Sequence, residues 1–125
     1  MVPAGEGHRT LLLVEDDDDV RDAMAGSLRD EGYVVAEAGN GRLALDWLQN
    51  HDDPCLILLD LWMPGMSGIE LHGHMVLDPR LKALPLVVVS AAGDAQERAT
   101  EMGALGFLRK PLDLKDLLAT VERYC

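Results

Sequence analysis

The feature that constrains this chain most is a short apolar run that ends in a single carboxylate. Residues 55–59 are all apolar, and Asp60 follows them directly. A continuous apolar run of this length, bounded by turn residues, indicates a strand that is buried on both faces. Pro64, Gly65 and Gly68 then indicate a tight loop. Because open α/β sheets bind ligands at the carboxyl ends of their strands, Asp60 is a candidate functional residue.

Similar apolar runs recur along the chain and alternate with segments of helical periodicity. The five predicted strands are residues 11–14, 33–38, 55–59, 86–90 and 106–108. Five helices are predicted. The first is capped by Asp17 or Asp18 and runs to Glu31, and the second ends near Asn50. The third covers residues 67–77, the fourth runs from a cap at Asp94 to Gly103, and the last follows a cap at Asp113. Residues 81–84 are expected to add only a turn. In the last helix, Leu114, Leu117, Leu118 and Val121 have the spacing of one buried face.

This alternation predicts an α/β fold, namely a doubly wound five-stranded parallel sheet with five helices. The length of 125 residues fits a single domain, with residues 1–9 as a flexible leader and residues 10–125 as the domain. The common strand order for five such units is 2-1-3-4-5, which places the first strand beside the third. The sequence therefore predicts that Glu15, Asp16 and Asp60 face one crevice, with Ser90 and Lys110 beside it.

Three carboxylates this close repel one another unless a cation lies among them. Oxygen ligands suit a hard ion, Mg²⁺ above all. A carboxylate nucleophile can accept a phosphoryl group, and a metal ion, a lysine and a hydroxyl can stabilise the charge on the transferred oxygens. The predicted crevice thus contains the functional groups that phosphoryl transfer needs, in the side chains of Glu15, Asp16, Asp60, Ser90 and Lys110.

Composition excludes several classes of protein. The net charge of −11 argues against nonspecific binding to nucleic acid or to anionic membranes. The sequence contains no run of eighteen or more apolar residues, so no transmembrane helix is predicted. The two cysteines, Cys55 and Cys125, are interpreted as unpaired thiols rather than as a disulfide framework, and a reducing, cytoplasmic location is expected.

Four motifs at the predicted strand ends together resemble the receiver domains of response regulators in two-component signalling, which are chemotaxis-regulator-like proteins of the flavodoxin-like fold. The motifs are Val-Glu-Asp-Asp at residues 14–17, Leu-Asp-Leu-Trp-Met-Pro-Gly-Met-Ser-Gly at 59–68, Val-Val-Ser-Ala at 88–91 and Leu-Arg-Lys-Pro at 108–111. Each motif alone is weak, but four at the correct strand ends are specific. The resemblance covers essentially the whole chain beyond the leader.

The resemblance implies a role for each residue of the predicted crevice. Asp60 would accept a phosphoryl group from a histidine kinase or a histidine phosphotransfer protein. Asp16 would ligate Mg²⁺ directly and Glu15 would act nearby through water, and the main-chain carbonyl of Trp62 would be a further ligand. Ser90 would bond to the phosphoryl group and Lys110 would pair with it.

The resemblance also implies a switch. Ser90 would move toward the phosphoryl group, and Phe107 would turn inward into the space that this frees. The surface of the fourth helix, fifth strand and fifth helix would then change its affinity for a downstream protein. A cis peptide bond between Lys110 and Pro111 is typical of such domains.

Two positions beside the crevice bear on the lifetime of an aspartyl-phosphate. Trp62 follows Asp60 by two residues and Ala92 follows Ser90 by two. Neither side chain can position an attacking water as an acid or an amide could. Slow self-dephosphorylation is predicted, with Trp62 and Ala92 as its gate, and the alternative is that Trp62 swings outward and leaves the site open.

The resemblance implies a signalling protein rather than an enzyme, since such a domain catalyses only its own phosphotransfer and autodephosphorylation. The rival function is an interaction module with the same fold that signals without phosphorylation. The sequence ends after the last predicted helix, so a stand-alone receiver and a receiver from a larger regulator or hybrid kinase are both open.

Overall fold

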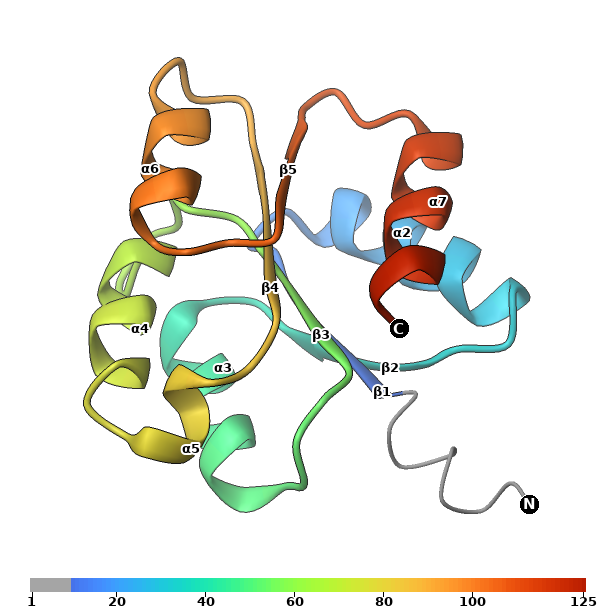
Figure 1. Ribbon diagram of the computed structural model, residues 1–125. Helices are drawn as coiled ribbons and strands as arrows, with labels where there is room; N and C mark the ends of the chain where they lie inside the picture. The colour runs from blue at the N-terminus through green and yellow to red at the C-terminus, as the bar shows by residue number, and fades with distance from the viewer. Residues whose placement is uncertain (1–9) are drawn as a thin grey trace.

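Five parallel strands form one sheet in the order β2-β1-β3-β4-β5, as predicted. The computed structural model describes residues 10–125, and the predicted leader lies outside the described residues. The strands are β1 (Thr10–Val14), β2 (Val34–Ala38), β3 (Leu56–Leu59), β4 (Leu86–Ser90) and β5 (Gly106–Arg109). All four strand pairs are parallel, so the carboxyl ends of the strands share one edge, at the top of Figure 1.

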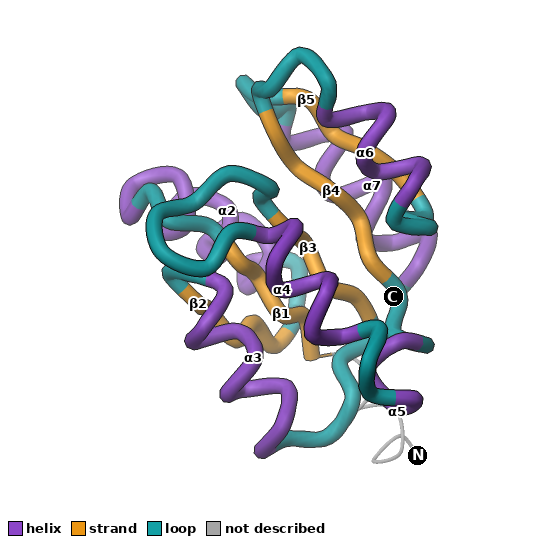
Figure 2. Tube along the Cα trace, turned by 90° about the vertical axis from the view of Figure 1, so that its left-hand side faces the viewer, coloured by secondary structure: helices purple, strands orange, loops and turns teal. Residues whose placement is uncertain are grey.

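Helices cover both faces of this sheet. They are α2 (Asp18–Asp30), α3 (Gly41–Asn50), α4 (Gly68–Met75), α5 (Pro79–Lys82), α6 (Ala95–Glu101) and α7 (Leu114–Tyr124). Helices α2 and α7 pack on one face, and α3 to α6 pack on the other (Figures 1 and 2). This two-sided covering explains why the central strands have no polar alternation.

The core consists of two layers, one on each face of the sheet. In β1, Leu11 and Leu13 point to the layer with α2 and α7, whereas Leu12 and Val14 point to the layer with α3 and α4. All four side chains are buried. Because successive side chains of a strand point to opposite faces, an apolar strand fills both layers at once.

The prediction of five helices is wrong by one. Residues 79–82 form the short helix α5, in the region where only a turn was expected. Pro79 occupies the start of α5, and the side chain of Asp78 accepts a hydrogen bond of 2.9 Å from the main-chain N–H of Arg80. The Asp-Pro pair therefore begins a new helix, since proline is well suited to the first helical position. Helix α4 already ends at Met75, two residues short of the predicted end at residue 77.

Two local predictions in the second half of the chain are also wrong. Asp94 lies at the start of α6 but makes no capping bond to the main chain; its carboxylate instead pairs with Arg98 at 2.8 Å. Its backbone (φ −98°, ψ 6°) is not in the extended conformation typical of a capping residue. Leu114 was expected in the core but is 46% exposed, because it is the first residue of α7 and lies beside an open groove.

The interpretation of the cysteines as unpaired is wrong. Cys55 and Cys125 form a disulfide, with a Cα–Cα distance of 5.2 Å. Cys55 immediately precedes β3, and Cys125 follows the end of α7 beside the same amino-terminal edge of the sheet. A separation of 70 residues gave no hint of this proximity, which arises because α7 runs back along the sheet from the carboxyl edge.

Within residues 10–125, no helix is both long and apolar enough to span a lipid bilayer.

Candidate metal centre at the carboxyl edge of the sheet

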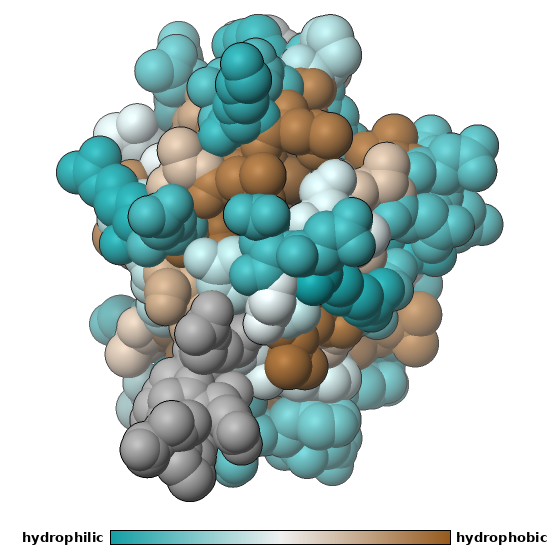
Figure 3. Space-filling model, turned by 90° about the vertical axis from the view of Figure 1, so that its right-hand side faces the viewer, coloured by the Kyte–Doolittle hydropathy of each residue, from teal (hydrophilic) through white to brown (hydrophobic). Residues whose placement is uncertain are grey.

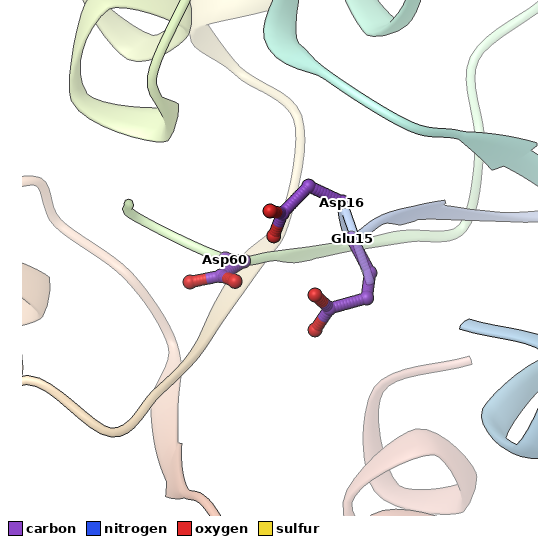
Figure 4. Close-up of side chains that lie close together, drawn as sticks. All are labelled: Glu15, Asp16 and Asp60. Carbon is purple, nitrogen blue, oxygen red and sulfur yellow. The ribbon is translucent and has the colours of Figure 1, made fainter. Parts of the chain in front are cut away.

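Three carboxylates meet where β1 and β3 end. Val14 pairs with Leu59 in the sheet register, and the main-chain N–H of Asp60 donates to the carbonyl of Val14 at 3.0 Å. Glu15 and Asp16 therefore emerge beside Asp60, as the strand order predicts. One ligand oxygen from each lies within 4.8 Å of the other two, and Figure 4 shows the three carboxylates turned toward a common space.

Lys110 joins this cluster from the end of β5. Its ammonium group pairs with the Glu15 carboxylate and with Oδ2 of Asp60, the latter at 3.0 Å. The main-chain N–H of Lys110 donates to the carbonyl of Ser90 at 3.1 Å, which fixes the start of the lysine side chain next to β4. The peptide bond between Lys110 and Pro111 is cis, as the resemblance implied.

The pKa values of two groups show the electrostatic character of the cluster. Burial raises the pKa of Glu15, and the bonds from Lys110 and from the Asp17 amide offset only part of this effect. For Lys110, burial lowers the pKa, but the hydrogen bonds to Glu15 and Asp60 outweigh it, so the pKa is raised. Lys110 thus remains a cation that holds two crowded carboxylates together.

A tight loop after β3 supports Asp60. A Cβ atom on Gly68 would lie 2.3 Å from the main-chain oxygen of Asp60, so a larger residue does not fit there. Ser67 caps α4, since its hydroxyl accepts from the N–H of Glu70 at 3.1 Å and the Glu70 carboxylate accepts from the N–H of Ser67. This reciprocal cap fixes the loop beside the acidic cluster.

Ser90, Ala92 and Trp62 lie beside the carboxylates. Ser90 ends β4, is buried, and accepts a hydrogen bond from the N–H of Ala92 at 3.2 Å. The N–H of Trp62 donates to Oδ1 of Asp60 at 3.3 Å. Trp62 is 48% exposed. The guanidinium carbon of Arg98 lies 5.5 Å from the centroid of its indole ring. The roles of Trp62 as a carbonyl ligand and as a gate stay predictions.

Phe107 lies in β5, which β4 separates from β3, the strand that precedes Asp60. It is half-buried and packs against the cluster formed by Leu61, Val88 and α6. The guanidinium carbon of Arg109 lies 5.1 Å from its ring centroid. Phe107 also lines a surface cavity of about 410 Å³ between β5 and α7, so space exists beside it for a change of position.

The structure adds three contacts that the sequence did not suggest. The N–H of Asp17 donates to Oε2 of Glu15 at 3.1 Å, and Arg21 donates to the main-chain carbonyl of Glu15 at 2.8 Å. Arg98 packs on Trp62. Neither arginine contact has a signal in the sequence. Arg21 lies six residues after Glu15, which is outside α2, so no helical spacing relates the two. The contact of α6 with the loop after β3 joins segments that are distant in sequence.

The donor set fits a divalent cation of the Mg²⁺ type. Glu15, Asp16 and Asp60 offer only oxygen atoms, which are the ligands that Mg²⁺ prefers. Asp16 is the most exposed of the three, so the cluster is open to solvent on its side. The positive charge of Lys110 offsets only one of the three negative charges, which leaves a net attraction for a cation.

Comparison with known proteins gives a consistent result. The family model described as response regulator receiver domain matches residues 11–122. Sporulation initiation phosphotransferase F of Bacillus subtilis is 33% identical over 117 residues, which cover 91% of both chains. Transcriptional regulatory protein PdtaR of Mycobacterium tuberculosis is 35% identical over 91% of this chain, but the match spans only 55% of that relative.

Solved structures agree with these relatives. A putative response regulator from Chloroflexus aurantiacus superimposes with a TM-score of 0.85 at 33% identity, covering 93% of this chain and 96% of the other. The family match covers nearly all of the described residues, and it includes every residue of the acidic cluster together with Ser90 and Lys110. The chain belongs to the response regulator receiver domain family.

Proposed function

We propose that this chain is a cytoplasmic phosphoacceptor switch that takes a phosphoryl group from a phosphohistidine donor onto Asp60, with Mg²⁺ as cofactor. One observation carries the proposal: the ammonium group of Lys110 bridges Glu15 and Asp60 within a cluster of three carboxylates. A cation poised on a carboxylate nucleophile, next to an acidic metal site, is the arrangement that phosphoryl transfer requires.

The reaction is an exchange of one bond to phosphorus for another. A carboxylate oxygen of Asp60 forms the new bond while the nitrogen–phosphorus bond of the donor histidine breaks, and the electron pair leaves with the imidazole. The bound metal supplies charge neutralisation for the transferred phosphoryl oxygens. Lys110 already lies 3.0 Å from Oδ2 of Asp60 and would pair with the same oxygens, and the Ser90 hydroxyl would donate to one of them.

The chain would therefore catalyse only its own phosphorylation and dephosphorylation. Incubation with a small phosphodonor and Mg²⁺ should add one base-labile phosphoryl group, and chelation of Mg²⁺ should prevent it. A protein that stays unlabelled with both reagents present would support the rival function, an interaction module that signals without phosphorylation.

Mg²⁺ should also stabilise the unphosphorylated protein. Binding to the folded state alone adds about 1.4 kcal/mol when free Mg²⁺ is tenfold above its dissociation constant, so the melting temperature should rise by roughly 3–6 °C. Asp16→Asn should remove most of the rise, because it deletes a carboxylate of the cluster. Thermal melts with and without Mg²⁺ measure this. Asp19→Asn, an exposed acid outside the cluster, is the matched control and should keep the full rise; an equal rise in the Asp16 variant would mean that the ion binds elsewhere.

The proposed output surface consists of α6, β5 and α7. Phosphorylation would draw Ser90 toward the phosphoryl group and let Phe107 turn inward. Phe107 and Tyr124 line the same 410 Å³ cavity, so a movement of Phe107 would alter the shape of this surface. A downstream protein that binds the altered surface more tightly would shift the population toward the active form.

The donor is proposed to dock on an apolar groove beside the site. The groove has a volume of about 490 Å³. Its lining comes from α2, from the residue after β4, from the residues around the cis peptide bond and from the start of α7: Val20, Ala23, Met24, Ala91, Lys110, Pro111, Leu112 and Leu114. Figure 3, which faces the side of α2 and α7, shows hydrophobic residues gathered in its upper part, toward the carboxyl edge of the sheet. A domain that brings a phosphohistidine to Asp60 must cover the surface next to Lys110, and this groove offers it an apolar contact.

Ala23→Glu is expected to slow phosphotransfer from a protein donor by at least about tenfold, because it places a charge in this groove. Labelling by a small phosphodonor should be unchanged. The measurement uses an autophosphorylated histidine kinase that transfers to the wild-type protein. Ala119→Glu, an exposed alanine on α7 outside the groove, is the matched control. Equal transfer rates in the two variants would place the donor on another surface.

A further inference from the structure

The disulfide joins two elements that are far apart in sequence and distant from the acidic cluster. Cys55 lies just before β3, and its main-chain N–H donates to the carbonyl of Thr10 at 2.9 Å. Cys125 follows α7, and its N–H donates to the carbonyl of Val121 at 2.8 Å. A main-chain hydrogen bond thus holds Cys55 to β1 at the amino-terminal edge of the sheet, whereas the bond of Cys125 continues the last turn of α7.

The geometry of these backbones allows a bond without rearrangement. The Cα–Cα distance of 5.2 Å lies within the range of 4.4–6.8 Å that disulfides usually span. Cys55 and Cys125 are both partly exposed, and both pack at the border of the core layer beneath α2 and α7. An oxidant or a reductant in solution can therefore reach the sulfur atoms, because access is a main determinant of thiol–disulfide exchange.

The bond adds a covalent link to the end of α7, where Leu118 and Tyr124 also pack against the core layer beneath α2 and α7. Only Leu117 and Val121 of this helix are buried. Near its end, the hydroxyl of Tyr124 donates to the carbonyl of Leu105 at 3.2 Å. The two cysteines are 70 residues apart in the sequence, and the loop that the disulfide closes includes β3, β4, β5 and α7. Closing so long a loop strongly restricts the unfolded chain, so the bond has a large effect on stability.

We propose that Cys55 and Cys125 are a reversible thiol–disulfide pair that sets how firmly α7 is held on the sheet. Oxidation removes two protons and two electrons from the two thiols, and a low-molecular-weight disulfide such as oxidised glutathione accepts them and becomes two thiols. One cysteine thiolate first forms a mixed disulfide, and the second cysteine then displaces the small thiol. Excess thiol reverses both steps.

The expectation of reversibility rests on the proposed cytoplasmic location, where disulfides are usually transient, catalytic or redox-sensing. The pair lies at the edge of the sheet opposite Asp60, so it acts on α7 rather than on the phosphoacceptor. Since α7 lines the cavity beside Phe107, the redox state would control how freely one wall of the proposed output surface moves. The experiment below uses no phosphorylation, so its failure is distinct from failure of the proposed function.

The test equilibrates the full chain in reduced or oxidised glutathione, without denaturant. Oxidised wild-type protein should form no disulfide between chains, lose both reactive thiols by mass-detected alkylation, and melt about 10 °C higher than the reduced protein. Excess dithiothreitol should restore both thiols and the lower melting temperature. Amide hydrogen exchange in α7 should be slower in the oxidised state than in the reduced state.

Cys55→Ser and Cys125→Ser are the control variants. Each can form only a mixed disulfide with glutathione, so neither should show the rise in melting temperature or the slower amide exchange in α7 that the oxidised wild type shows. The proposal is overturned if the native wild type keeps two alkylatable thiols in oxidised glutathione, if it forms intermolecular dimers instead, or if the bond resists excess dithiothreitol in the native protein. Equal exchange rates in α7 for the two redox states would also overturn it.

Discussion

The phosphorylated wild-type protein is expected to lose its phosphoryl group slowly, and the double variant Trp62→Asn with Ala92→Glu should lose it about tenfold faster. A tenfold change corresponds to roughly 1.4 kcal/mol of activation free energy. Hydrolysis needs a water in line with the bond that breaks. The main chains of Trp62 and Ala92 are fixed beside this approach, because their N–H groups donate to Asp60 and to the Ser90 hydroxyl, respectively.

The wild-type side chains at these two positions cannot orient such a water. Alanine has no polar side-chain atom, and the indole offers only a donor. The contact of Arg98 with the Trp62 ring adds a link between α6 and the loop after β3, across the side of the site where Ala92 lies. Asparagine and glutamate would remove the indole and supply acceptors for a water.

Phosphate release from the isolated phosphoprotein, followed over time in Mg²⁺, measures this effect. Trp62→Phe is the matched control: it keeps an aromatic ring without a polar group, and it should retain the slow rate. If the double variant and the wild type release phosphate at the same rate, Trp62 and Ala92 do not gate the water.

The sheet could be predicted from the sequence because each central strand is an uninterrupted apolar run that ends in a polar residue. Leu56–Leu59 and Leu86–Ser90 are buried on both faces, so nothing in their pattern suggested another structure. The strand order then followed from the alternation with helices. The ends of helices were harder to predict. An Asp-Pro pair can break a helix or start one, and here Asp78 and Pro79 start α5 after α4 has already ended at Met75.

The acidic cluster could be predicted because sheet topology alone brings it together. Adjacent parallel strands place Glu15, Asp16 and Asp60 at one edge, and Lys110 reaches them from β5. The contact of Arg98 with Trp62 could not be predicted, because it depends on where a loop side chain turns. The disulfide could not be predicted either, since it depends on how far α7 runs back along the sheet before Cys125.

Asp60→Asn should abolish phosphorylation entirely, which is the largest effect expected for any single substitution here. The amide cannot act as the nucleophile, yet it has nearly the same shape and keeps an oxygen to accept from the N–H of Trp62. The variant should therefore fold, which a thermal melt checks. Asp19→Asn, an exposed acid on α2, should be labelled like the wild type.

The central claim is that Asp60 is the phosphoacceptor, and peptide mapping after reaction with a small phosphodonor and Mg²⁺ tests it most directly. The account predicts one phosphoryl group per wild-type chain, located on Asp60, and none on the folded Asp60→Asn protein. A phosphoryl group mapped to another residue of the wild type, or an equal yield on the Asn variant, would contradict it.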